Sequence, residues 1–330
     1  MSRLRLHRSL VRMTSYELSY ATPGDPPLKR WLMRAIENLS GRLRLLPLYH
    51  RWRDESAGKS PHMWADALGL IATRLEVDAP ADWHRHIPAG PLVMIANHPF
   101  GIADGIAMLA LAERIGRPYR ILLYADFMRV PEVQPLGLPI DFSDSKGATA
   151  TNLETRAQAR RLLKDGVTIV IFPAGGVATA ETPFGAAEEL PWKPFVVRLI
   201  QQTNATVLPV HFEGQNSPLF HLVSRFSLTL RLSLLVSEFR HKIGSTIRAT
   251  VGTPVPCSVI AERAGTGRDA FLDELYVLVR RLAPDAKNAD RAALLPRPLH
   301  ERHHYPWDSL PDTATRPMSA RSSREHSSGA

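Results

Sequence analysis

The sequence predicts an α/β protein with a mixed, mostly parallel sheet flanked by helices on both faces and an N-terminal basic helical extension. Two observations predict this fold class. The chain of 330 residues is 44% apolar and 22% charged, which is typical of a globular protein with a sizeable core. From residue 91 onward, short apolar runs alternate with segments of helical periodicity. Such alternation is typical of a sheet that is covered on both faces.

The first predicted element is an amphipathic helix over residues 28–46. Its apolar residues recur at helical spacing and form one stripe, made of Leu28, Leu32, Ala35, Ile36, Leu39, Leu43 and Leu46. Two interpretations stay open. Such a stripe most often packs on the body of its own protein, which we take as the first expectation. A basic amphipathic helix can also lie on a membrane surface.

The central part of the chain supplies the next elements. Residues 61–75 have helical periodicity. The apolar run 92–96 predicts a buried strand, and 102–115 predicts a helix that Gly116 and Pro118 close. Another strand is predicted over 119–124.

The second half of the chain continues the alternation. Thr151 and Glu154 form a potential capping box that opens a helix over 151–164. The further predicted elements are strands 167–172 and 206–212, helices 194–202 and 269–282, and strand candidates 227–235 and 246–251.

Composition divides the chain into three parts. Residues 1–60 form the basic extension, 61–284 the α/β domain, and 285–330 a tail rich in Pro, Arg, His and Ser, whose last residues, 311–330, we expect to be disordered.

The single cysteine, Cys257, excludes an internal disulfide framework. Three prolines interrupt the longest uncharged run, 87–103, so no membrane-spanning helix is predicted, and the start of the chain lacks the apolar core of a secretory signal.

The positive charge is concentrated at the start of the chain. The formal net charge is +9, and residues 1–53 contribute 11 − 3 = +8 of it. A local basic region implies an anionic partner surface, either nucleic acid or anionic lipid.

No metal is expected: a His-Glu-x-x-His pattern at 300–304 stands among prolines, which oppose the helix that a zinc site of this kind needs.

The most informative segment runs from Asn97 to Asp104. His98 and Pro99 follow a predicted buried strand directly, Gly101 allows a turn, and Asp104 falls in the first turn of the next helix. In open α/β sheets, ligands bind beyond the carboxyl ends of the strands. His98 is therefore placed as a general base would be, and Asp104 is near enough in sequence to fix its tautomer. A His–Asp pair alone is more often a turn cap than a catalytic pair.

Two further segments end predicted strands in the same way. Phe172-Pro173-Ala174-Gly175-Gly176 follows one strand, and its glycines let the backbone approach a ligand closely. Leu208-Pro209-Val210-His211-Phe212-Glu213-Gly214 ends another predicted buried strand.

These motifs, in this order, resemble those of the glycerolipid acyltransferase superfamily, which includes lysophosphatidate and glycerol-3-phosphate acyltransferases. The resemblance covers roughly residues 15–257 and is closest to the bacterial branch of hemolysin-like and ornithine-lipid acyltransferases. It implies acyl transfer from a thioester of coenzyme A or acyl carrier protein to a lysolipid hydroxyl, without a bound cofactor. His98 would be the general base and Asp104 would orient it. The implied substrate contacts are Asn97, Pro99, Gly101, Phe172, Pro173, Gly175, Gly176 and Lys193.

The sequence departs from the family pattern in two motifs. The third motif usually carries a glutamate, but Ala174 and Gly176 occupy the corresponding places here, and Glu181 is the nearest candidate replacement. The second motif usually presents an arginine to a phosphate; here Lys146 or Arg156 would have to serve.

The implied protein acts at the cytoplasmic face of the membrane as a peripheral enzyme, because its basic start would bind anionic lipid. Two alternatives belong to other classes. One is a catalytically silent lipid-binding relative, suggested by the missing glutamate. The other is a nucleic-acid-binding protein, suggested only by the basic charge and lacking a recognisable reader motif.

Overall fold

The computed structural model describes residues 18–21, 24–141, 146–297 and 302 of the chain, and the structural statements below concern these residues. Seven strands form one sheet in the order β1-β7-β6-β2-β5-β3-β4. Their bounds are β1 Arg74–Asp78, β2 Leu92–Ala96, β3 Tyr119–Tyr124, β4 Gly137–Ile140, β5 Thr168–Ile171, β6 Thr206–Phe212 and β7 Thr246–Val251. Neighbouring strands are parallel except for the pair of β6 and β7. The predicted mixed, mostly parallel sheet is therefore confirmed.

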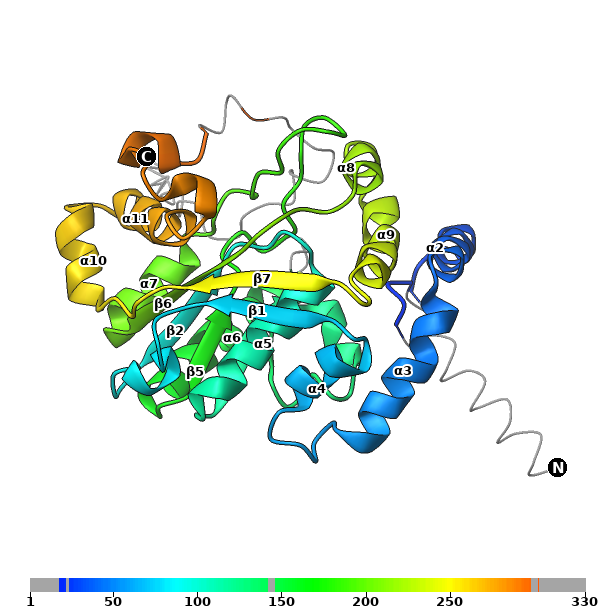
Figure 1. The fold of residues 1–330 in the computed structure, drawn as a ribbon, viewed down its shortest axis with the longest axis horizontal. Helices are drawn as coiled ribbons and strands as arrows, with labels where there is room; N and C mark the ends of the chain where they lie inside the picture. The colour runs from blue at the N-terminus through cyan, green and yellow to red at the C-terminus, as the bar shows by residue number, and fades with distance from the viewer. Residues whose placement is uncertain (1–17, 22–23, 142–145, 298–301, 303–330) are drawn as a thin grey trace, which may run out of the picture.

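Helices cover both faces of this sheet (Figure 1). The α-helices are α2 Pro27–Leu39, α3 Arg42–Glu55, α4 Met63–Leu70, α5 Ile102–Ile115, α6 Lys146–Lys164, α7 Phe195–Thr203, α8 Pro218–Ser224, α9 Leu228–His241, α10 Cys257–Ala264, α11 Arg268–Arg280 and α12 Arg291–Leu294. Short 3₁₀ turns add Trp83–His86, Ala125–Arg129 and Pro284–Ala286.

The central strand β2 joins two hydrophobic cores because successive side chains point to opposite faces. Leu92, Met94 and Ala96 belong to the core formed with α3, α4 and α5. Val93 and Ile95 belong to the core formed with α6, α7, α10 and α11. All five residues are at most 1% exposed. A strand buried on both faces explains the unbroken apolar run in the sequence.

One predicted strand is wrong. Residues 227–235 lie in α9, although apolar and polar residues alternate there. The helix begins where the Ser227 hydroxyl accepts a hydrogen bond from the amide of Leu230. Its buried side includes Arg231, which donates to the carbonyl of Val177 and the hydroxyl of Thr179. Because the polar Arg231 lies on the buried face, the buried positions of this helix do not form an apolar stripe at helical spacing in the sequence.

Two helix boundaries also differ from the prediction. The expected helix over 28–46 is two helices, α2 and α3, separated at Gly41, whose φ of 101° lies in the left-handed region. The helix expected from Thr151 begins at Lys146 instead. Thr151 therefore lies inside the helix and not at its start. The side chain of the neighbouring Asn152 exchanges two hydrogen bonds with the backbone of Asp141.

Two strands escaped the prediction. β1 begins at Arg74, so only its first two residues fall in the segment 61–75 that was expected to be helical. β4 contains a glycine and a proline, which are unfavourable in a central strand but tolerated here because β4 is at the sheet edge.

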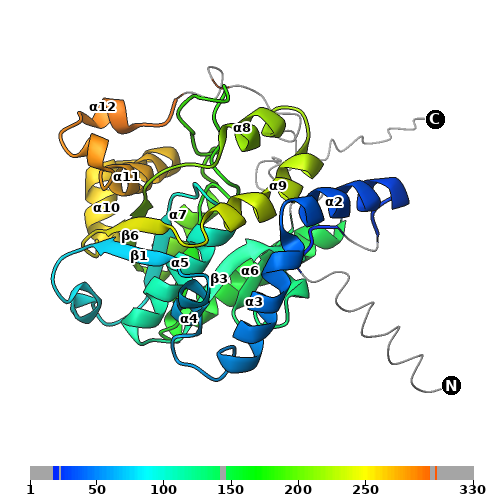
Figure 2. The same cartoon turned by 45° about the vertical axis from the view of Figure 1, so that its right-hand side comes forward.

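The apolar stripe of α2 faces outward, so its expected packing on the protein body is wrong. Leu28 is 76% exposed, Leu39 is 85% exposed, and Trp31 beside them is 66% exposed. The helix instead buries the opposite side, with Met33 and Glu37. Figure 2 shows α2 lying along α9 at one end of the molecule.

The first residues after 284 pack in a small hydrophobic cluster with the end of α11. Leu294 packs with Val277, Ala283 and Ala286. The predicted disordered segment 311–330 and the first four arginines of the basic extension lie outside the described residues. Within the described residues, every helix is too short or too polar to cross a bilayer.

We expect the Leu111→Ala substitution to lower the free energy of unfolding by about 2–5 kcal/mol, because Leu111 in α5 is fully buried and its loss leaves a cavity. The matched control is Leu153→Ala in α6, whose side chain is 59% exposed and whose loss should cost no more than about 0.5 kcal/mol. Urea unfolding followed by circular dichroism measures both. Equal losses would contradict this description of the core.

Candidate active site

The site is built on the turn between β2 and α5, which is fastened to the neighbouring strand. The side-chain amide of Asn97 donates to the carbonyl of Phe212 at 2.9 Å, and its oxygen accepts from the amide of Phe212 at 2.7 Å. This pair of bonds locks the carboxyl ends of β2 and β6 together. Gly101 then turns the chain into α5 with a φ of 88°, which favours glycine.

His98 and Asp104 meet at this turn. Asp104 is wholly buried in the first turn of α5, whereas 17% of the His98 side chain is exposed. The Nδ1 of His98 lies 3.1 Å from the Oδ1 of Asp104, within ion-pair distance, although the contact is not aligned as a hydrogen bond. The other carboxylate oxygen accepts the amide of Phe100 at 2.8 Å. Asp104 therefore holds both the turn and one side of the imidazole.

The loop after β5 forms the wall against which the imidazole packs. The ring of Phe172 stacks on the His98 ring with centroids 4.2 Å apart and planes inclined by 28°. The amide of Ala178 donates to the His98 carbonyl at 2.8 Å. The structure thus brings the first and third predicted motifs together at one sheet edge.

The remaining predicted residues occupy the same loop but contribute differently. Pro173 is buried, and its carbonyl accepts the main-chain amide of Lys193 at 2.9 Å. The amide of Gly175 donates to the Phe172 carbonyl at 2.9 Å, so it is already occupied within the turn. A Cβ atom at Gly176 would lie 2.7 Å from the Cδ1 of Leu190, so a larger residue there would require the Leu190 side chain to move. Pro99 is buried in the His98 turn.

Sequence reasoning missed one carboxylate at the site, that of Glu189. Its Oε1 accepts the main-chain amide of His98 at 2.7 Å, and its Oε2 accepts the indole Nε1–H of Trp192 at 2.7 Å. Burial of the carboxylate raises the pKa of Glu189 to about 7.

The carboxylate that the sequence offered in place of the third-motif glutamate lies elsewhere. Glu181 forms an ion pair of 2.7 Å with Arg297, and both side chains are 40% exposed. Arg297 also pairs with Glu188 at 2.7 Å, and Arg302 donates to the Glu189 carbonyl at 2.8 Å. These arginines hold the segment that carries Glu189.

The cations near the site also differ from those proposed for the second motif. Arg156 lies in α6 with its guanidinium 5.3 Å from the centroid of the Phe195 ring, and the side chain of Lys146 lies outside the described residues. Lys242, which follows α9, places its Nζ 3.5 Å from the centroid of the Phe100 ring. Burial lowers the pKa of Lys242, while Glu238 and Asp104 act in the opposite direction.

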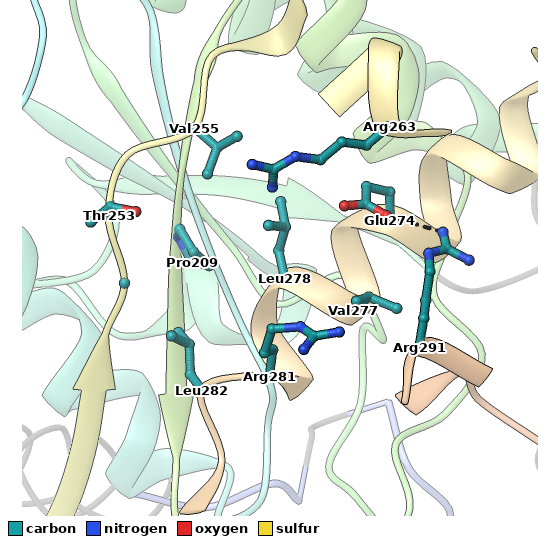
Figure 3. A pocket seen from close by; sticks show the side chains of 11 residues that line it. Pro209, Thr253, Val255, Arg263, Glu274, Val277, Leu278, Arg281, Leu282 and Arg291 are labelled. Carbon is teal, nitrogen blue, oxygen red and sulfur yellow. Dashed lines mark hydrogen bonds and ion pairs between the residues drawn. The ribbon is translucent and has the colours of Figure 1, made fainter. Parts of the chain in front are cut away.

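A cavity of about 340 Å³ lies beside α10, α11 and α12, and none of its lining residues is a predicted site residue. Figure 3 shows Arg263, Arg281 and Arg291 around it, with Arg291 paired to Glu274 at 3.0 Å. Among the described residues, no group of three or more His, Cys, Asp or Glu side chains could hold a metal ion.

Comparison with known proteins gives a consistent result. A family model described as Acyltransferase matches residues 77–268, more than half of the chain. Two curated proteins named lyso-glycine lipid O-acyltransferase are similar: that of Phocaeicola vulgatus is 26% identical over 174 residues, and that of Bacteroides thetaiotaomicron is 28% identical over 181 residues. Each alignment covers 51% of this chain, and 60% and 61% of the respective relatives, so less than two thirds of each relative is matched.

A solved structure is also similar, that of the 1-acyl-sn-glycerophosphate (LPA) acyltransferase PlsC from Thermotoga maritima. It shares 14% identity with a TM-score of 0.43, over 86% of this chain and 90% of that chain.

We expect Gly101→Ala to lower the free energy of unfolding by about 1–3 kcal/mol, because a side chain is strained at this φ. The new Cβ would also lie 3.1 Å from side-chain atoms of Leu235 and Val177. Gly105→Ala is the matched control, since Gly105 is helical with open space around its Cβ position, and it should raise stability by up to about 1 kcal/mol. Thermal and urea unfolding measure both, and opposite signs are the expected result.

Proposed function

The chain belongs to the acyltransferase family, and from this premise we propose that it transfers a fatty acyl group from an acyl thioester to a hydroxyl group of a lysolipid. One observation carries the proposal. A partly exposed imidazole, that of His98, lies against the buried carboxylate of Asp104 at the carboxyl edge of a mostly parallel sheet. This edge is where α/β proteins of this kind bind their ligands.

In the proposed reaction, His98 accepts the proton of the lysolipid hydroxyl as its oxygen attacks the thioester carbonyl carbon. Asp104 faces Nδ1, so it would keep the ring oriented and stabilise the imidazolium that forms. A tetrahedral intermediate then collapses, and its carbon–sulfur bond breaks. The leaving thiolate takes the proton from the imidazolium, which restores neutral His98 and releases a thiol. The scheme needs no serine or cysteine nucleophile.

The oxyanion of the intermediate requires hydrogen-bond donors, and the loops around His98 offer few main-chain amides for this purpose. Those of His98, Phe100 and Gly175 already donate to Glu189, Asp104 and Phe172. Pro99 has no amide hydrogen. We therefore assign the oxyanion to the amides of Gly101 and Gly176.

The choice of substrates follows from the relatives and from the charges near the site. The curated relatives are named for a lyso-glycine lipid, so a lysolipid whose headgroup is not a phosphomonoester is the acceptor to test first. This agrees with the missing second-motif arginine. Acyl-coenzyme A and acyl carrier protein thioesters are both donors to test, because the same carbonyl chemistry serves either.

The outward stripe of α2 supports a peripheral membrane location. Leu28, Trp31 and Leu39 are large apolar side chains that face solvent on a helix next to the basic start of the chain. The helix α9 contacts α2 on one side and approaches the catalytic turn on the other, where Leu235 lies beside Gly101. A lipid surface that meets α2 would thus lie close to the proposed base. We place this surface at the cytoplasmic face of the membrane.

We expect His98→Ala to lower kcat by at least about 10³-fold and Asp104→Asn by about 10²–10⁴-fold, because general-base catalysis and its orientation are removed. The measurement is transfer of a radiolabelled acyl chain from acyl-coenzyme A and from acyl carrier protein to lysolipids. His241→Ala and Asp269→Asn replace exposed residues of the same types and should leave the rate unchanged. A wild-type chain that transfers nothing to any lysolipid would favour the silent lipid-binding alternative.

A double variant, Leu28→Glu with Leu39→Glu, should bind vesicles of anionic phospholipid at least tenfold more weakly than wild type, because it places charges on the face that would enter the bilayer surface. Leu153→Glu, exposed on α6, is the matched control and should bind normally. Vesicle co-sedimentation and the blue shift of Trp31 fluorescence report binding. Wild-type chain that ignores vesicles and binds oligonucleotides instead would favour the nucleic-acid alternative.

A further inference from the structure

Glu189 is half-buried, and it differs from the buried glutamates in what it binds. Glu37 accepts the hydroxyl of Ser19 and the amide of Tyr20 and so ties α2 to the segment before it. Glu113 accepts the amides of Trp64 and Ala65 in the first turn of α4. Glu238 accepts the amide and hydroxyl of Ser217 at the start of α8. The latter two bind donors at the start of another helix, which is an ordinary structural role.

Glu189 binds no helix start. Its main-chain donor is His98, the residue whose imidazole faces Asp104, and its second donor is the indole of Trp192. Both carboxylate oxygens are therefore occupied by N–H groups, an arrangement that suits the ionised form. A carboxylate that binds the main chain of the candidate base is in a position to act on that base.

The contacts of His98 show what Glu189 adds. Ala178 holds the His98 carbonyl, Phe172 stacks on one face of the ring, and Asp104 faces Nδ1. Glu189 holds the remaining main-chain group, the amide. With both peptide groups fixed, the direction of the Cα–Cβ bond is fixed, and the ring can turn only about its side-chain bonds.

Glu189 is itself anchored from two directions. Trp192 is 7% exposed and meets the ring of Tyr276 on α11 edge to face, with centroids 5.3 Å apart. Arg302 binds the Glu189 carbonyl, and Arg297 ties the same segment through Glu188. Because these contacts hold the segment that carries Glu189, its carboxylate restrains the main chain of His98.

We propose that Glu189 is a positioning residue for acyl transfer: through the His98 amide it fixes the imidazole in the orientation from which it takes the acceptor proton. The inference rests on the function proposed above. The usual third-motif glutamate is missing from this sequence, and Glu189 supplies a carboxylate at the site. This carboxylate acts on the base and does not touch the substrate.

The decisive variant is Glu189→Gln, which keeps size and shape but presents an NH₂ group to one of the two N–H donors. We expect kcat to fall by about 10–100-fold, with KM for thioester and lysolipid within about threefold of wild type, because misorientation affects the reacting geometry more than binding. Glu181→Gln is the control: it removes a carboxylate of the same segment that pairs with Arg297 and does not contact His98, and should leave kcat within about twofold of wild type.

Nuclear magnetic resonance of the His98 amide gives a readout that does not depend on turnover. In the wild-type chain its proton signal should lie downfield, because the amide donates to a carboxylate. In Glu189→Gln the signal should move upfield, because a neutral acceptor replaces the carboxylate. The neighbouring His98, Asp104 and Tyr276 are unchanged in the variant, so the difference reports the loss of the carboxylate.

The outcomes separate the two proposals. If His98→Ala is inactive but Glu189→Gln has wild-type kcat, the positioning role is wrong and the proposed function stands. If His98→Ala keeps wild-type activity, the general-base proposal fails and the positioning role fails with it. If Glu189→Gln does not fold, Trp192→Phe decides: it removes the second donor and should lower kcat by several-fold, and an unchanged kcat would overturn the inference.

Discussion

The carboxylate of Asp104 is the constraint on which the arrangement at the sheet edge depends. It is fully buried, and it uses one oxygen for the amide of Phe100 and presents the other to His98. Burying a carboxylate is costly unless its oxygens have partners. The conformation that brings the Phe100 amide to one oxygen also places the imidazole of His98 in front of the other. The position of the Asp104 carboxylate thus determines both the shape of the turn and the orientation of the imidazole ring.

The helix α9 connects this turn to the outer surface of the molecule. Leu235 packs with Val177 and Phe220 and reaches Gly101, and Lys242 lies over the Phe100 ring. On its other side α9 supports α2, whose apolar residues are exposed. An exposed apolar patch of this kind is typical of a binding surface, and the lipid contact proposed above would account for both the patch and the charge of the chain start. The same helix would then bring substrate and base into one neighbourhood.

The sequence predicted the central strands of the sheet well. β2 and β6 are buried along most of their length and give apolar runs, whereas β7 alternates buried and exposed residues, the other pattern typical of a strand. Strands 92–96, 119–124, 206–212 and 246–251 were predicted with their observed bounds. The prediction failed where tertiary contacts decide. Arg231 lies on the buried side of α9, and the stripe of α2 faces outward, neither of which periodicity can show.

At the site, the turn from Asn97 to Asp104 was predictable because all its parts are close in sequence. Glu189 was not, since it reaches His98 across 91 positions and no local pattern reports such a contact. The predicted roles of the site residues stay predictions until variants are assayed. The membership in the acyltransferase family is confirmed, because the family model covers the whole stretch that carries these motifs.

The contacts of Arg297 and Arg302 have a consequence for the synthesis of the chain. They reach back over more than a hundred positions to fasten the segment beside His98. A ribosome that has made all seven strands has still not delivered these two side chains. The segment beside His98 can therefore be fastened only after residues 297 and 302 have been synthesised and have left the ribosome.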